Sequence, residues 1–246
     1  MVANKTADYD FTIVVPVYNE EDNMAMAEDK LKAYLQHASK KSCVLFVNDG
    51  STDNSLSRIT GICSNNPDFY YLSFERNCGL SAAIKAGIDF TQSPLVGYID
   101  ADLQTDPEDF ELLLEHAEQY PLVIGIRAKR KDSWWKRRQS RIANSFRRKV
   151  TGDTALDTGC PLKVLHTDVA KKMPFFKGLH RFIPALVQLQ KLEYKQVPVS
   201  HHQRVAGVSK FSMRNRLWGP LADCFAFRWM RKRYINYTIS QDNIKR

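Results

Sequence analysis

The sequence predicts an α/β fold in which helices flank a mostly parallel β-sheet. Short apolar runs alternate with segments of helical periodicity through residues 1–126, a pattern typical of β-α-β units. Each run is apolar at consecutive positions, which indicates strands that are covered on both faces. Polar and acidic residues directly follow several of these runs, at the sheet edge where open α/β folds bind their ligands.

The apolar runs of the first half predict five strands, and the segments between them predict four helices. The predicted strands are Phe11–Val17, Cys43–Val47, Phe69–Phe74, Leu95–Ile99 and Leu122–Ile126. The predicted helices are Glu20–Ala38, Asp53–Cys63, Leu80–Phe90 and Pro107–Ala117. The first helix opens with acidic residues and the last with proline, and both features favour a helix N-terminus.

The second half of the chain has a less regular pattern. We expect a turn-rich loop at Asp153–Pro161, a helix at Leu179–Gln190, a strand at Gln196–Val205 and an amphipathic helix at Leu217–Lys232. A length of 246 residues suits one large domain, or one domain with an appendage.

Charge divides the chain into an acidic half and a basic half. Residues 1–126 hold 8 Lys or Arg and 20 Asp or Glu, whereas residues 127–246 hold 28 and 7. The basic half gives the whole chain a pI of about 9.3. We therefore expect this half to meet anions, which could be phosphates, a membrane surface or nucleic acid.

Cysteine usage and hydropathy indicate a protein of a reducing compartment. The five cysteines include no Cys-x-x-Cys pair and no zinc-type spacing, so reduced thiols are the simplest interpretation. The first residues lack the apolar core of a signal peptide, and no run of about 18 apolar residues occurs. We expect a cytoplasmic protein whose contact with a membrane is peripheral.

Two aspartates after the fourth predicted strand indicate a metal site. Asp100, Asp102 and Gln104 alternate along the chain, so in an extended segment their oxygens would face one side. Mg²⁺ and Mn²⁺ are usually bound by one or two carboxylates plus substrate phosphates, which fits a nucleoside diphosphate. The alternative is a pair of turn residues that lead into a helix. The position directly after an apolar strand favours the metal site.

Loops after the first two strands are expected to converge on the same crevice. Tyr18 and Glu20 follow the first strand, and Asp49 follows the second. Tyr18 could stack on a base, and Asp49 could accept hydrogen bonds from a nucleobase or lie near the metal. In the alternative interpretation, Pro16 only ends a strand and Asp49 is a turn or helix-cap residue.

Seven segments of the chain occur together in one order. They read VVPVYNEEDN, VNDGSTDNS, NCGLSAAIKAG, YIDADLQTDPEDF, DTGCPLKV, LHRFIPAL and RVAGVSKF. This set resembles family 2 glycosyltransferases of the GT-A fold, and among them the dolichyl- and polyprenyl-phosphate sugar transferases, over roughly residues 10–215. The resemblance implies a Rossmann-like sheet, a nucleotide-sugar donor, a lipid-phosphate acceptor and Mg²⁺ or Mn²⁺.

The resemblance also implies roles for individual residues. Those that would line the nucleotide pocket are Pro16, Tyr18, Glu20 and Asp49. Those that would hold the metal are Asp100, Asp102 and Gln104, and Asp100 would also lie near the ribose. Those that would contact the acceptor phosphate or the donor diphosphate are Arg127, Arg137, Arg204, Ser209 and Lys210.

The implied reaction is an inverting transfer of a sugar from a UDP- or GDP-sugar to a polyprenyl phosphate. A lipid monophosphate is mostly a dianion at neutral pH, so it needs neighbouring cations more than a strong general base. Three departures from the lipid-phosphate transferases leave the acceptor open: the loop Asp157–Pro161, the GVSK sequence at residues 207–210, and the absence of apolar spans after it. A family 2 enzyme that acts on a glycan or another cell-envelope acceptor is the alternative.

The expected organisation is a GT-A catalytic domain at residues 1–215 and a basic amphipathic segment at residues 216–246. Residues 1–126 would bind the nucleotide sugar, and residues 127–215 would bind the acceptor. Residues 127–149 carry 11 Lys or Arg and one acid, with Trp134 and Trp135 among them. This composition and the amphipathic C-terminal helix favour an anionic membrane surface as partner. The alternative for the helix is packing in the core, in a homo-oligomer or on a membrane protein.

Two other function classes lack the motifs that they require. The high pI permits a nucleic-acid-binding module, but the chain has no zinc-finger, RRM or basic-zipper pattern. A dinucleotide-dependent oxidoreductase needs Gly-x-Gly-x-x-Gly after the first strand, where this chain reads VPVYNEEDN. We therefore expect no nucleic-acid partner.

Overall fold

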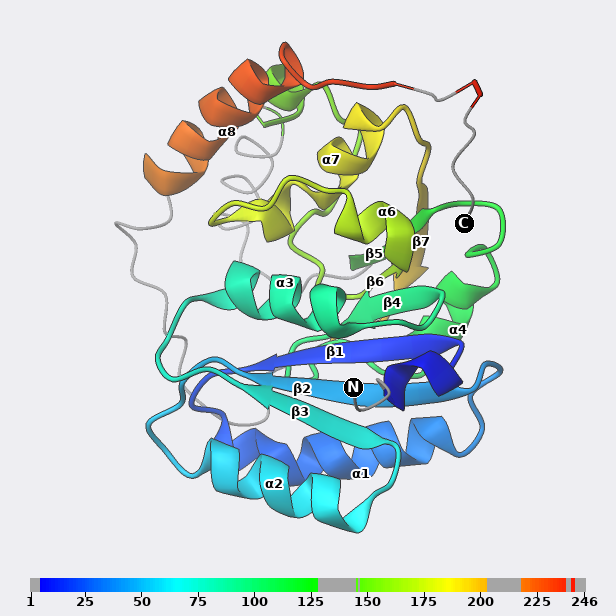
Figure 1. Cartoon of the computed structure of the whole chain (residues 1–246), viewed down its shortest axis with the longest axis vertical. Coiled ribbons are helices and arrows are strands. Elements are labelled where there is room, and N and C mark those ends of the chain that lie inside the picture. Colours follow the sequence, from blue (N-terminus) through cyan, green and yellow to red (C-terminus); the bar gives the residue numbers. More distant parts are fainter. Residues whose placement is uncertain (1–4, 128–144, 146, 203–217, 238–239, 242–246) are drawn as a thin grey trace.

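One β-sheet forms the centre of the molecule. The computed structural model describes residues 5–127, 145, 147–202, 218–237 and 240–241. Within this part, seven strands form a sheet in the order β3-β2-β1-β4-β6-β5-β7 (Figure 1). The strands are β1 (Phe11–Val17), β2 (Ser42–Asn48), β3 (Phe69–Ser73), β4 (Leu95–Tyr98), β5 (Leu122–Arg127), β6 (Lys163–His166) and β7 (Lys195–Val199).

The sheet is parallel except at β6. Strand β1 pairs in parallel with β2 and β4, and β2 with β3. Strand β6 lies antiparallel between β4 and β5, and β7 is parallel to β5. Every strand but β6 therefore points the same way, and the carboxyl ends of these strands lie at one edge together with the first residue of β6. We call this the carboxyl edge of the sheet.

Helices cover both faces of the sheet (Figure 1). One layer consists of α1 (Met24–Leu35), α2 (Ser55–Asn65) and α4 (Asp109–Leu114). The other consists of α3 (Leu80–Phe90), α6 (Thr167–Lys171), α7 (Ile183–Leu189) and α8 (Trp218–Arg231). Short 3₁₀ turns are η1 (Lys5–Asp8), η2 (Glu21–Asn23) and η3 (Leu179–Arg181).

Two apolar cores, one on each face of the sheet, explain the unbroken apolar runs. In β1, Ile13 and Val15 pack in the core shared with α1, α2 and α4. Val14 lies between them in sequence and packs in the other core, with α3. All three are fully buried, because consecutive side chains of a strand point to opposite faces. The predicted α/β fold with strands covered on both faces is confirmed.

The first half folds close to its predicted elements, and the second half departs from them. The bounds of β1 and α3 are those predicted. The helix expected at residues 179–190 is split into η3 and α7, with proline in the first turn of α7. The strand expected to reach residue 205 ends at Val199, because the Ser200 N–H donates to the carboxylate of Asp109 (2.7 Å). Residues 203–205 lie outside the described part.

Strand β6 and helix α6 were not predicted. The apolar run at residues 162–165 is short and is interrupted by Lys163, so it lacked the signature of a buried strand. Pairing with β4 and β5 supplies the hydrogen bonds and the burial that make it a strand. Tertiary context overrides local preference at this point.

Among the described residues, one face of helix α8 packs against the rest of the second helical layer. The ring of Phe227 is buried and stacks on Phe182 at 5.6 Å between centroids, and Arg181 pairs with Asp223 at 3.7 Å. The opposite face exposes Phe225 and Trp229. No helix in the described ranges has both the length and the apolar character needed to cross a membrane.

Candidate active site

A tight turn carries the two predicted metal-binding carboxylates at the carboxyl edge. The N–H of Leu103 donates to the carbonyl oxygen of Asp100 (3.1 Å), and Leu103 has a positive φ of 43°. Residues 101–102 are therefore a turn, and the expectation of an extended segment is wrong. The directions of the Asp100 and Asp102 side chains are therefore set by this turn and not by the alternation of side chains along a strand.

The charges of Asp100 and Asp102 interact. Burial, and then the nearby charge of Asp102, raise the pKa of Asp100 to about 6. The positive charges of Lys163 and Arg127 oppose this rise. The N–H of Gln104 donates to the Asp102 carboxylate (3.3 Å). The turn thus gathers like charges that a cation would neutralise.

The ligand chemistry at this turn fits a hard divalent cation. Two carboxylates and one amide oxygen, from Asp100, Asp102 and Gln104, are oxygen donors of the kind that Mg²⁺ and Mn²⁺ prefer. Among the described residues, no three His, Cys, Asp or Glu side chains gather to form a metal cage.

Asp49 is buried, and its carboxylate holds the loop at residues 77–79. It accepts the backbone N–H groups of Cys78 (2.6 Å) and Gly79 (2.8 Å) and the side-chain amide of Asn77 (3.0 Å). Burial raises the pKa of Asp49, and the two backbone N–H groups lower it. Asp49 thus fixes the position of this loop, while its predicted contact with the nucleotide stays a prediction.

The loops after β1 and β2 are bound to one another. The amide oxygen of Asn19 accepts the N–H of Thr52 (2.7 Å), and the N–H of Asn19 donates to the hydroxyl of Ser51 (2.9 Å). Beside them, Tyr18 is 36% exposed. Glu20 accepts the side-chain amide of Asn23 (2.6 Å). These contacts bring the two predicted nucleotide loops together.

Pro16 lies within β1, opposite Val47 of β2. It is half-buried and does not end the strand, which continues to Val17. Pro16 lies one residue from the end of β1, and its place in the nucleotide pocket stays a prediction.

Arg127 is held by Asp157 across the carboxyl edge. Its Nε donates to Asp157 Oδ2 at 2.7 Å, and its Nη2 donates to Oδ1 at 2.8 Å. Both side chains are largely buried. The sequence pointed to Arg127 but gave no sign of this bidentate partner. The planar fork of an arginine fixes its direction in such a pair, so Asp157 determines where the remaining N–H groups of Arg127 point.

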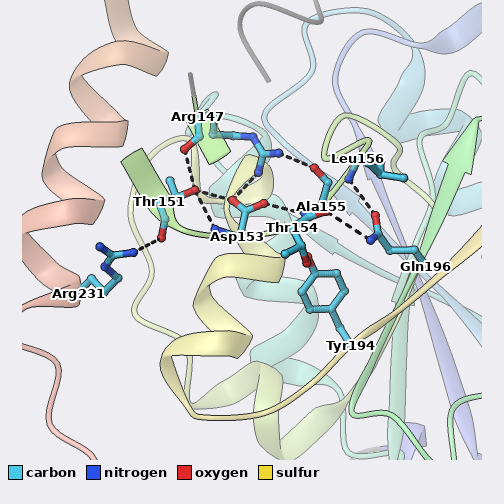
Figure 2. A network of polar contacts seen from close by, with 9 residues as sticks. All are labelled: Arg147, Thr151, Asp153, Thr154, Ala155, Leu156, Tyr194, Gln196 and Arg231. Atoms are coloured by element: carbon cyan, nitrogen blue, oxygen red, sulfur yellow. Dashed lines mark hydrogen bonds and ion pairs between the residues drawn. The ribbon is translucent and has the colours of Figure 1, made fainter. Parts of the chain in front are cut away.

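A second buried ion pair supports the loop that contains Asp157. Arg147 donates to the carboxylate of Asp153 (2.6 Å) and to the carbonyl oxygen of Ala155 (2.8 Å). Figure 2 shows this pair, with Arg231 of α8 reaching the carbonyl oxygen of Thr151 (2.7 Å) from the other side. The loop is therefore attached to the C-terminal helix as well as to the sheet.

Lys163 is a further charged residue of the site that the sequence interpretation missed. It is fully buried at the start of β6. Its ammonium donates to the Tyr98 hydroxyl (3.0 Å) and to the carbonyl oxygen of Cys160. Burial lowers the pKa of Lys163 to about 8, while the negative charges of Asp157 and Asp100 oppose that effect. The available signal was a lysine inside the apolar run LKVL.

Four of the predicted site residues, Arg137, Arg204, Ser209 and Lys210, lie outside the described residues. The N–H of His202 donates to the carbonyl oxygen of Gln104 (2.7 Å). His202, the last described residue before the segment with Arg204, Ser209 and Lys210, therefore lies beside the Asp100–Gln104 turn.

Comparison with protein families gives one match that covers most of the chain. Residues 12–175 match the model described as glycosyl transferase family 2. The match spans the Asp49 loop, the Asp100–Gln104 turn, Arg127 and Lys163.

Among curated proteins, two similar relatives are both called undecaprenyl-phosphate 4-deoxy-4-formamido-L-arabinose transferase. The protein of Edwardsiella ictaluri (strain 93-146) is 34% identical over 205 residues, which cover 82% of this chain and 63% of the relative. That of Yersinia pestis (strain Pestoides F) is 32% identical, over 82% and 62%. This chain thus spans about three fifths of the length of the curated relatives that it matches.

Solved structures with the same fold include two glycosyl-transferring enzymes. Glucosyl-3-phosphoglycerate synthase from Mycobacterium tuberculosis, in complex with phosphoglyceric acid, has a TM-score of 0.68 at 17% identity, covering 92% of this chain and 81% of that one. A mannosyltransferase from Pyrobaculum calidifontis, in complex with GDP-Man and Mn²⁺, has a TM-score of 0.67 at 17% identity, covering 89% and 63%. These likenesses confirm the predicted GT-A fold.

Proposed function

The chain belongs to glycosyl transferase family 2, and on this premise we propose that it transfers a sugar from a UDP- or GDP-sugar to a polyprenyl phosphate, with inversion at the anomeric carbon. One observation carries the proposal. At a single edge of the sheet, the buried carboxylate of Asp100 lies close enough to the carboxylate of Asp102 and to the guanidinium of Arg127 for both charges to act on it. A site that joins two phosphate-bearing reactants needs both signs of charge.

The acidic part of the site would bind the donor. Asp100, Asp102 and Gln104 would hold Mg²⁺ or Mn²⁺. The bound cation would neutralise the negative charge of the leaving diphosphate. Tyr18, which is 36% exposed, would stack on the base, and Pro16, Glu20 and Asp49 would complete the nucleotide pocket. In support, the mannosyltransferase of the same fold was solved with GDP-Man and Mn²⁺.

The basic part of the site would bind the acceptor. A phosphate monoester attacks as a dianion, so the protein has to lower the repulsion between it and the donor diphosphate. Arg127 uses two of its five N–H groups on Asp157, and others can serve the acceptor phosphate. Arg137, Arg204, Ser209 and Lys210 are proposed to complete this field. The curated relatives support a lipid phosphate, because their name contains undecaprenyl phosphate.

A screen of nucleotide sugars tests the proposal. Purified protein would be incubated with radiolabelled UDP- and GDP-sugars, with and without Mn²⁺, in the presence of polyprenyl phosphate. We expect Mn²⁺-dependent transfer of label into the organic phase with at least one donor. Faster label transfer to a soluble glycan than to polyprenyl phosphate would refute the lipid acceptor and favour the glycan alternative.

The proposed division of labour along the chain follows the same lines. Residues 1–126 would bind the nucleotide sugar and residues 127–215 the acceptor, although strands of both parts share one sheet. Residues 216–246 would bring the enzyme to its lipid substrate at the cytoplasmic face of the membrane.

The exposed face of α8 supports this membrane contact. Phe225 and Trp229 are 57% and 61% exposed, and Arg228, Lys232 and Arg233 are exposed beside them. The guanidinium of Arg233 lies 4.9 Å from the Trp229 ring centroid. Aromatic residues flanked by cations are typical of helices that lie on anionic bilayers.

Vesicle binding tests the membrane contact. Co-sedimentation with phosphatidylglycerol vesicles should exceed that with phosphatidylcholine vesicles, and the double change Phe225→Ser and Trp229→Ser should reduce it. Phe90→Ser is the matched control, because Phe90 is 55% exposed on α3. Equal binding of all three proteins, or self-association that depends on Trp229, would favour an oligomer face instead.

A further inference from the structure

Lys163 is a buried charge that none of the proposed steps uses. It begins β6, opposite Tyr98 of β4, and it is fully buried. Its ammonium also lies 4.9 Å from the centroid of the Tyr98 ring. The position is at the carboxyl edge, close enough to Asp100 for the two charges to act on each other, yet no part of the side chain reaches the surface.

The two acceptors of the Lys163 ammonium belong to opposite sides of the site. The Tyr98 hydroxyl (3.0 Å) comes from the end of β4, two residues before Asp100. The carbonyl oxygen of Cys160 comes from the loop whose Asp157 holds Arg127. One side chain thus connects the strand that carries the metal turn to the loop that directs the acceptor arginine.

Burying the Lys163 ammonium at this position has a cost in free energy. Moving a charged group out of water costs several kcal/mol even after relaxation, and burial indeed lowers the pKa of Lys163. No carboxylate of the described part of the chain lies within ion-pair distance of it. An apolar side chain of similar length would pack here without that cost. The feature that an apolar residue lacks is a donor that binds both acceptors at once.

We propose that Lys163 is a positioning residue that fixes the distance between the Asp100–Gln104 turn and the Arg127–Asp157 pair. The proposal rests on the proposed function, because it assigns the turn to the donor and the pair to the acceptor. In-line attack requires the two reactants to be aligned, and a misplacement of about 1 Å can lower the rate about 100-fold. We call the two hydrogen bonds of the Lys163 ammonium the brace. Loss of the brace should therefore slow sugar transfer to the acceptor more than hydrolysis of the donor alone.

Two variants and one control separate positioning from general stability. Lys163→Met removes the donor and keeps the length of the side chain. Tyr98→Phe removes only the hydroxyl acceptor and serves if Lys163→Met does not fold. Lys171→Met is the matched control, because Lys171 also donates to a backbone carbonyl, that of Thr91 (2.6 Å), but near the amino end of β4.

The kinetic readout compares transfer with hydrolysis. For Lys163→Met we expect sugar transfer to polyprenyl phosphate to fall about 10- to 100-fold. Acceptor-independent, Mn²⁺-dependent hydrolysis of the same nucleotide sugar should fall less than about threefold, because it needs only the donor side. Tyr98→Phe should show the same split with a smaller loss, and Lys171→Met should show none. Equal losses of both reactions would overturn the proposal.

Hydrogen exchange gives a readout that does not depend on the reaction. In Lys163→Met, amide exchange should rise together at residues 99–104 and 157–161, whereas Lys171→Met should leave both segments unchanged. Unchanged exchange in a folded Lys163→Met protein would overturn the brace even if sugar transfer were absent. If Lys163→Met raises exchange in both segments but the wild-type protein transfers no sugar, the proposed function is refuted and the positioning role of Lys163 is retained.

Discussion

The two sides of the site, which we propose to bind the donor and the acceptor, are held together by different interactions. On the donor side, the carboxylate of Asp49 is satisfied by neutral N–H donors of one loop. On the acceptor side, Arg127 pairs with Asp157 and Arg147 pairs with Asp153, and each pair is largely buried. A buried charge that loses its partner costs more than a lost neutral hydrogen bond. Charge substitutions should therefore affect chemistry on the donor side and stability on the acceptor side.

Asp102→Ala should break the chemistry and spare the fold. Removing a carboxylate from the proposed metal site should lower sugar transfer by about 1000-fold, since metal neutralisation of the leaving group is worth several kcal/mol. The free energy of unfolding should change little, because Asp102 is only half-buried. Asp106→Ala is the control, since Asp106 lies in the same loop but pairs with Lys30 at 3.7 Å. Full activity of Asp102→Ala would refute the proposed metal site at Asp100, Asp102 and Gln104.

Arg147→Met should have the opposite profile. It leaves the buried carboxylate of Asp153 without its partner (Figure 2), so the free energy of unfolding should fall by about 3–5 kcal/mol. Urea unfolding measures the loss. The double change Arg147→Met with Asp153→Leu should recover much of it, because removing both charges is cheaper than removing one. If the single variant were as stable as the wild type, the contrast between the two sides would be lost.

The same contrast explains what the sequence could predict. The turn at Asp100–Gln104 and the loops after β1 and β2 follow strands whose apolar runs are visible, so the sequence could place residues such as Asp49 and Asp102 at the carboxyl ends of strands. Their roles in the site stay predictions. The partners of Arg127 and Arg147 depend on how a turn-rich loop folds, and no periodicity records that. Strand β6 was missed because a lysine interrupts it, and that lysine is the residue that we propose as the brace.

The protein should also lose stability as Asp100 ionises. Its folded pKa is about 6, above the usual value of 3.8 for an aspartate. Between about pH 4 and 6 the folded protein therefore binds more protons than the unfolded chain, so stability falls as pH rises through that window. We expect a decrease of about 2 kcal/mol in metal-free protein, measured by urea unfolding.

Asp100→Asn provides the reference for that experiment. An amide does not titrate, so the difference between the two proteins isolates the contribution of Asp100 from that of other acids. A difference that stays constant from pH 4 to 7 would show that Asp100 titrates normally. The charge of Asp100 would then not lower the stability of the folded protein, and the difference between the two sides would need another cause.

The smallest effects come from one substitution made on both sides, glycine to alanine. Gly152, in the acceptor-side network, has a φ of +77°, and an added Cβ would lie 2.2 Å from Nη1 of Arg231. Gly152→Ala should therefore destabilise by about 1–2 kcal/mol. Gly61 lies exposed inside α2, on the donor side, with nothing within 4 Å of an added Cβ. Gly61→Ala should stabilise by about 0.5–1 kcal/mol, because alanine loses less entropy in a helix.

Thermal unfolding of the two glycine variants gives the most local test of the comparison. Opposite shifts in the midpoint would show that the acceptor-side loop is fixed by its contact with α8, as the bond from Arg231 to Thr151 indicates. Stabilisation by both substitutions would mean that the Arg231 side chain can move away from residue 152 at little cost in free energy. In that case α8 could leave the loop at little cost, and membrane contact through Phe225 and Trp229 would not reach Arg127 through this network.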